Sequence, residues 1–169
     1  IDLTLTLRRG MRGVDWEESR SVGKDGWNAR TLHLYSHAGT HMDAQTHFAA
    51  GDETIDQIPL KSCMGYAVAV DVPDLKPGDL ITLAHLGSVR HTFLRGDSLL
   101  LRTGWAHYVD NLSIYRDGMP RVSEELALWC VAAGVNVLGV EPPSVADVHN
   151  MDELTHIHQI LLSNRITIV

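Results

Sequence analysis

The sequence predicts a single α/β domain that spans residues 1–169. Two β-rich runs, at residues 66–72 and 97–103, are each followed by turn residues and have the length of buried strands. A strand, helix, strand order is expected to end at residue 140, and a further helix at 152–164 leads to a last strand at 166–169. Alternation of strands and helices is typical of α/β folds.

The first expected strand, at residues 31–37, rests on strict alternation. In TLHLYSH, leucines alternate with polar and aromatic side chains, which is the period of two that a strand requires. We expect this strand to end before Gly39, because glycine permits the bend that would follow.

Two helices are predicted from capping signals and apolar periodicity. The segment 123–134 begins with Ser123, a favourable N-cap, and ends at Gly134. The segment 152–164 has four apolar residues on one helical face: Leu154, Ile157, Leu161 and Leu162. His158 lies in the middle of that face, whereas His156 points nearly opposite.

Composition excludes several classes of function. The formal net charge is −7, from 14 basic and 21 acidic residues, and the basic residues are scattered, so no nucleic-acid partner is expected. No apolar run approaches the roughly 20 residues of a membrane helix, so no membrane partner is expected either. The two cysteines, Cys63 and Cys130, have no metal-binding spacing, and Cys130 is predicted to be a buried structural thiol.

The segment SHAGTHMDAQTHF, residues 36–48, concentrates possible metal ligands. His37, His41, Asp43 and His47 are spaced by 4, 2 and 4 residues. A helix would turn the last two away from the first two, and a straight strand would spread the ends over roughly 33 Å. A strand, a tight turn through Gly39 and a short extended piece bring the first three together.

Imidazoles with a carboxylate form a donor set that suits zinc, and also manganese or iron. A divalent metal is therefore the expected cofactor, with Zn²⁺ favoured and Mn²⁺ the alternative. His47 then serves as a catalytic base. The alternative for each histidine taken alone is a hydrogen-bonded turn or core residue, but four candidates around one glycine bend favour a metal site.

The segment HAGTHMDAQTH resembles the HxGTHxDxPxH signature of the cyclase-like metal hydrolase family, which includes bacterial kynurenine formamidases (arylformamidases) and isatin hydrolases. Four further blocks resemble the family in the same order: DLTLTL, LLLRTGW, LGVEPPSV and HQILLSNRITIV. The resemblance implies a swivelling β/β/α domain, a homo-oligomer with active sites near subunit contacts, and amide hydrolysis by metal-activated water.

The resemblance also implies residue roles. His37, His41 and Asp43 match the family's metal ligands, with Asp43 bridging if two ions bind, and His47 matches the catalytic histidine. His158 matches a later histidine that binds the second metal, in agreement with its place on the helical face.

Three positions depart from the family pattern. The family's further Glu or Gln ligand would fall at position 170, after Val169, so the domain is expected to lack its C-terminal part. Gln45 stands where the family usually has proline. Glu141 replaces an aspartate, and the alternative for Glu141 is that it only caps a neighbouring backbone.

Two residues are candidates for substrate binding. Trp27 could stack on an aromatic substrate, although a tryptophan is more often a packing residue. Thr103 lies at the end of an expected strand, where a pocket could use it.

These observations predict a metal-dependent amidohydrolase that cleaves a linear or cyclic amide, either an aryl formamide such as N-formylkynurenine or an isatin-like ring amide. The alternative is a non-catalytic metal- or ligand-binding relative of the same fold. The expected partners are a small-molecule amide substrate and further copies of the chain in a homodimer or homotetramer. A cytoplasmic location is expected, with export left open because the sequence begins at Ile1 rather than at Met.

Overall fold

A computed structural model describes residues 2–169, and the chain divides into two compact units, Ile1–His41 and Met42–Val169. The single domain over residues 1–169 stays a prediction. Within the second unit, strands alternate with helices around a parallel sheet, which confirms the predicted α/β class.

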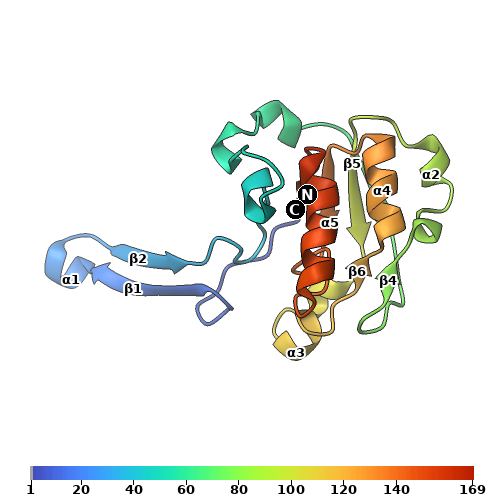
Figure 1. The fold of residues 1–169 in the computed structure, drawn as a ribbon. Coiled ribbons are helices and arrows are strands. Elements are labelled where there is room, and N and C mark those ends of the chain that lie inside the picture. Colours follow the sequence, from blue (N-terminus) through green and yellow to red (C-terminus); the bar gives the residue numbers. More distant parts are fainter. Residues whose placement is uncertain (1) are drawn as a thin grey trace. The chain divides into compact units, whose positions relative to one another are not determined.

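The first unit is built on an antiparallel hairpin. Strand β1, Val14–Arg20, pairs with β2, Ala29–Leu34, and the short helix α1, Val22–Asp25, connects them at the tip (Figure 1). Apolar residues face each other across the two strands at Val14↔Leu34 and Trp16↔Leu32. The predicted strand at 31–37 is wrong at its end, because pairing stops at Leu34 and a turn begins at residue 36.

The second unit contains a parallel sheet in the order β3-β5-β7-β8. Its strands are β3, Ala67–Asp71; β5, Ser98–Arg102; β7, Val137–Val140; and β8, Thr167–Ile168. All four were predicted. A smaller parallel pair joins β4, Leu80–Ile81, to β6, Arg121–Val122.

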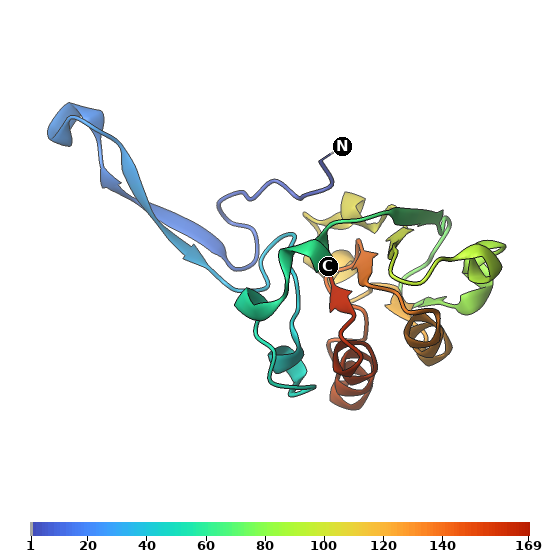
Figure 2. The same cartoon turned by 90° about the horizontal axis from the view of Figure 1, so that it is seen from above.

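Two longer helices pack side by side on one face of this sheet (Figure 2). Helix α4, Glu124–Ala133, begins after Ser123, whose hydroxyl accepts a hydrogen bond from the Leu126 amide, and it ends at Gly134 with φ +72°. Helix α5, Met151–Ser163, has Asn150 as its N-cap. Both predicted helices are confirmed.

The remaining helical segments are short. The α-helical turns are α2, Val89–Thr92, and α3, Leu112–Tyr115. The 3-10 turns are η1, Gln45–Phe48; η2, Ile55–Gln57; η3, Leu60–Cys63; η4, Leu83–Leu86; and η5, Trp105–Tyr108. None of the helices in residues 2–169 combines the length and apolar character needed to cross a lipid bilayer.

The core of the second unit lies between the sheet and the two long helices. Leu99 and Leu138 from the strands, Leu126 from α4 and Leu161 from α5 are fully buried in it. Cys130 is also fully buried, as predicted, and burial raises the pKa of its thiol to about 12. Because this core fixes α5 against the sheet, side chains on the inner face of α5 have defined positions.

Candidate metal centre

In the first unit, two of the predicted ligands lie in the turn region that follows β2. The rings of His37 and His41 meet edge to face, with their centroids 4.8 Å apart. Gly39 between them has φ +62°, a left-handed backbone conformation that favours glycine.

The orientation of the His41 ring is defined by a local hydrogen bond. Its Nδ1 lies 2.9 Å from the Gly39 carbonyl oxygen, and only a protonated Nδ1 can donate to that oxygen. In the neutral ring the lone pair is then on Nε2, which is the arrangement that a metal-binding imidazole usually has.

In the second unit, Asp43 is fixed at the edge of the sheet. Its amide donates to the carbonyl oxygen of Ile168 at 2.9 Å, which makes an isolated antiparallel bridge to β8. The side chain of Asp43 is buried, with 6% of the residue exposed. A buried carboxylate is costly unless hydrogen bonds or a cation stabilise it, so its place in a centre that can hold a cation is physically reasonable.

The 3-10 turn η1 carries His47 and is attached to α5 by two side-chain amides. The amide group of Gln45 donates to the Leu162 carbonyl oxygen at 3.1 Å, and that of Gln159 donates to the Phe48 carbonyl oxygen at 3.2 Å. Gln45 therefore provides one of these two attachments. His47 itself is exposed.

His158 faces the same region from α5. It is 3% exposed, and its Nδ1 lies 2.7 Å from the Leu154 carbonyl oxygen, so the lone pair of the neutral ring is on Nε2, as in His41. Asp43, His47 and His158 each offer a ligand atom, and these atoms lie within 4.8 Å of one another. Two imidazoles and one carboxylate at such separations fit a zinc or manganese ion.

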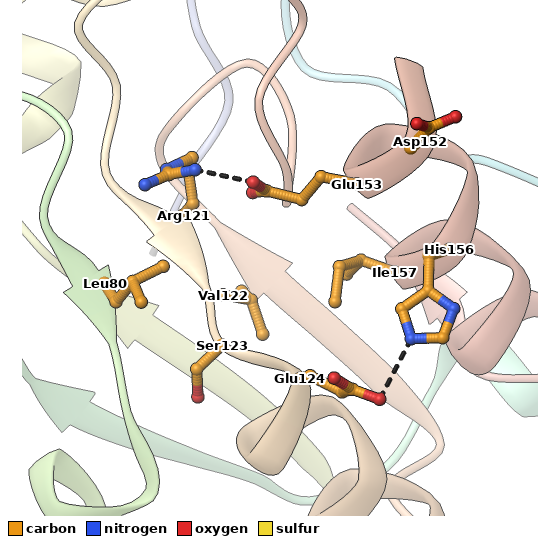
Figure 3. A pocket seen from close by; sticks show the side chains of 9 residues that line it. All are labelled: Leu80, Arg121, Val122, Ser123, Glu124, Asp152, Glu153, His156 and Ile157. Carbon is orange, nitrogen blue, oxygen red and sulfur yellow. Dashed lines mark hydrogen bonds and ion pairs between the residues drawn. The ribbon is translucent and has the colours of Figure 1, made fainter. Parts of the chain in front are cut away.

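His156 lies outside this cluster, as helical periodicity predicts. Its Nε2 lies 3.0 Å from the Glu124 carboxylate, and both side chains are more than half exposed. The two residues line a separate pocket at the N-terminal ends of α4 and α5 (Figure 3). There Arg121 forms a second ion pair, with Glu153 at 2.6 Å, so this pocket's basic groups already have carboxylate partners.

Thr103 and Glu141 join the carboxyl ends of β5 and β7. One carboxylate oxygen of Glu141 accepts hydrogen bonds from the Thr103 amide at 3.1 Å, the Thr103 hydroxyl at 2.9 Å and the Trp105 amide at 2.8 Å. The interpretation of Glu141 as a backbone cap is therefore confirmed. Substrate binding by Thr103 stays a prediction, as does that by Trp27, which is 56% exposed in the first unit.

Sequence reasoning missed the contribution of Phe48. This residue follows directly after the histidine motif, and its ring stacks on that of His158 with centroids 4.1 Å apart. An aromatic residue adjacent to a ligand motif was the only available signal, because the partner lies on a helix about 110 residues later in the chain.

The sequence model of the family described as "Putative cyclase" matches residues 1–147, and the chain belongs to this family. It is similar to a kynurenine formamidase of Salinibacter ruber, with 27% identity over 150 residues that cover 86% of this chain and 66% of that protein. It is also similar to a kynurenine formamidase of Bacillus cereus, with 30% identity over 151 residues that cover 87% of this chain and 65% of that protein.

Solved structures show the same fold. An isatin hydrolase bound to the product analogue thioisatinate superimposes with a TM-score of 0.80 at 16% identity, covering 97% of this chain and 72% of that one. A potential metal-dependent hydrolase with cyclase activity superimposes with a TM-score of 0.75 at 21% identity, covering 99% and 78%. The cyclase-like fold is thereby confirmed. The chain spans about two thirds of the length of the two formamidases.

Proposed function

We propose that this chain provides the metal centre of a hydrolase that cleaves a linear or cyclic amide. The substrate would be an aryl formamide such as N-formylkynurenine, as for the formamidase relatives, or an isatin-like ring amide, as for the isatin hydrolases. The observation that carries the proposal is the cluster of Asp43, His47 and His158, whose ligand atoms lie within 4.8 Å of one another.

The proposed ligands are His37, His41 and Asp43, with His158 as a ligand of a second ion. Only Met42 separates His41 from Asp43, and side chains two residues apart on an extended segment point to the same side. In both His41 and His158 a carbonyl oxygen holds the Nδ1 proton, so Nε2 can bind an ion. Zn²⁺ is the proposed ion, with Mn²⁺ as the alternative, and when bound it would polarise the amide carbonyl and lower the pKa of a bound water to about 7.

His47 is the proposed proton shuttle. It is exposed on η1, whereas Asp43 and His158 are buried, so within this cluster His47 is the residue that an incoming substrate can reach. Its imidazole would take a proton from the attacking water and deliver it to the departing nitrogen, a role that typically contributes about 10²- to 10⁴-fold in rate.

The remaining parts of the proposal concern substrate binding, assembly and location. Trp27 would stack on an aromatic ring of the substrate. The hydroxyl of Thr103 already donates to Glu141, so towards a substrate it would act as an acceptor. A homodimer or homotetramer and a cytoplasmic location complete the proposal.

The test compares zinc content and turnover in matched histidine variants. N-formylkynurenine and isatin are assayed with wild-type protein and with His47→Ala, His158→Ala and His156→Ala. We expect His158→Ala to lose the second ion, to which His158 is the proposed ligand, and His47→Ala to keep the zinc content of the wild type while turnover falls by about 10²- to 10⁴-fold. His156→Ala, on the same helix but outside the cluster, should match the wild type in both measurements.

Two results would contradict the proposal. A stoichiometric ion without turnover of either amide would support the alternative, a non-catalytic metal-binding relative. Equal zinc loss in His47→Ala and His158→Ala would make His47 a ligand instead of a proton shuttle, which the short distances in the cluster also permit.

A further inference from the structure

Phe48 contacts both histidines of the cluster in the second unit. Its ring stacks on His158 with an interplanar angle of 25° and a centroid distance of 4.1 Å. The same ring meets His47 at 73° and 4.5 Å. One aromatic side chain therefore borders the candidate ligand on the helix and the candidate shuttle on the 3-10 turn.

The His158 ring is held at its edge and on one face. At the edge, Nδ1 bonds to the Leu154 carbonyl oxygen. On the face, the Phe48 ring lies nearly parallel and restricts rotation about the last side-chain torsion, which is otherwise broad for histidine. Rotation of the imidazole out of the stacked plane would break the hydrogen bond of Nδ1 and move Nε2, so the stacked ring and this hydrogen bond favour the same orientation, which is the one that a metal ligand requires.

Phe48 is itself fixed to the helix that carries His158. Its carbonyl oxygen accepts a hydrogen bond from Gln159, the residue next to His158, and Gln45 at the other end of η1 bonds to Leu162. The side chain of Phe48 also packs against the main hydrophobic core. These contacts hold η1 against α5, so the position of the Phe48 ring relative to the His158 ring is determined by the fold.

We infer that Phe48 is a positioning residue of the metal centre: its ring holds the His158 imidazole in the orientation and tautomer that leave Nε2 as the metal-binding nitrogen. The inference rests on the proposed function in one respect, namely that His158 binds an ion. The competing interpretation is that Phe48 only fills space beside the core. The two differ in what they predict for the His158 ring when no metal is bound.

The test uses the two phenylalanines of the chain. Phe48→Ala removes the stacked ring, and Phe48→Leu keeps most of the volume but removes the aromatic face, which guards against a simple folding defect. Phe48→Tyr keeps an aromatic ring and should therefore behave like the wild type. Phe93→Ala is the matched control, because Phe93 also packs against the main core but contacts Trp129 instead of the histidines.

Two measurements are made on each folded variant. Long-range ¹H–¹⁵N spectra of metal-free protein, at about pH 8 where an ordinary imidazole is neutral, report the tautomer of the His158 ring. Competition with a chromophoric chelator reports zinc affinity. We expect the Nδ1–H tautomer in the wild type, Phe48→Tyr and Phe93→Ala, and a mixture of tautomers in Phe48→Ala and Phe48→Leu with zinc affinity lower by about 10- to 100-fold.

The outcomes separate the inference from the proposed function. An unchanged tautomer and zinc affinity in Phe48→Ala and Phe48→Leu, as in Phe93→Ala, would overturn the inference. A tautomer that depends on Phe48 in protein that binds neither zinc nor manganese would support ring positioning while refuting the proposed function.

Discussion

Replacing Glu141 with alanine should measure how strongly its carboxylate joins the ends of β5 and β7. In the wild type one oxygen of Glu141 accepts from the amide and hydroxyl of Thr103 and from the amide of Trp105. Glu141 is half-buried and Trp105 is only 2% exposed, so water can replace these bonds only in part.

The expected loss of stability follows from these contacts. A hydrogen bond to a charged acceptor typically contributes about 1.5–3 kcal/mol, and one between neutral groups about 1 kcal/mol. The Trp105 amide keeps a second acceptor, the Thr103 hydroxyl oxygen at 3.2 Å, and the exposed part of the site reduces each contribution. We therefore expect Glu141→Ala to lower the free energy of unfolding by about 3 kcal/mol, and Glu141→Gln, which keeps an acceptor oxygen, by about 1 kcal/mol.

Urea unfolding followed by tryptophan fluorescence measures both values. The control is Glu124→Ala. The ion pair that Glu124 forms with His156 in the wild type lies on the surface and should contribute less than about 1 kcal/mol to the free energy of unfolding. A stability loss in Glu141→Ala no larger than in the control, or equal losses in Glu141→Ala and Glu141→Gln, would refute the assigned role of the acceptor oxygen.

Two further predictions use groups whose pKa is raised by burial. At about pH 8 a thiol reagent should label only Cys63 in the native protein and both cysteines in denaturant, because Cys130 is fully buried and its pKa is raised to about 12; labelling of both in native protein would contradict this. Burial, assisted by the charge of Glu141, also raises the pKa of Tyr115 from 10.0 to about 12. The folded state therefore retains protons that the unfolded state releases, so stability should be full below about pH 9 and fall as the pH rises towards 12. Urea midpoints that stay constant or rise between about pH 9 and 12 would refute this second prediction.

Secondary structure in the second unit could be predicted because its signals are local. Ser123 and Gly134 bound α4 by capping and by a left-handed backbone conformation, both of which are encoded within one helical turn. The end of β2 could not be predicted, because Leu34 is the last residue to pair with β1 and the pairing partner, Val14, is distant in sequence. Alternation alone continues to residue 37 and gives no sign of where the partner strand begins.

The candidate site was predictable in its chemistry but not in its construction. Spacing and residue type identified His37, His41, Asp43 and His47 within eleven positions, and helical periodicity selected His158 over its neighbour. The hydrogen bonds of His41 and His158 are local, but the contacts that attach η1 to α5 and stack Phe48 on His158 join residues more than 100 positions apart, and no local pattern specifies such pairs.

The structure explains why a site in a largely irregular segment can still be well ordered. Residues 43–48 are attached at one end to β8, through the amide of Asp43, and at the other end to α5, through Gln45 and Phe48. Helix α5 and strand β8 are joined by only three residues, 164–166, and Leu161 and Ile166 around that connection are buried in the core. Both attachments therefore lead to the packed pair of α5 and β8, and α5 also carries His158. Because the donors of the cluster share a single rigid support, their separations depend on core packing and not on the conformation of a free loop.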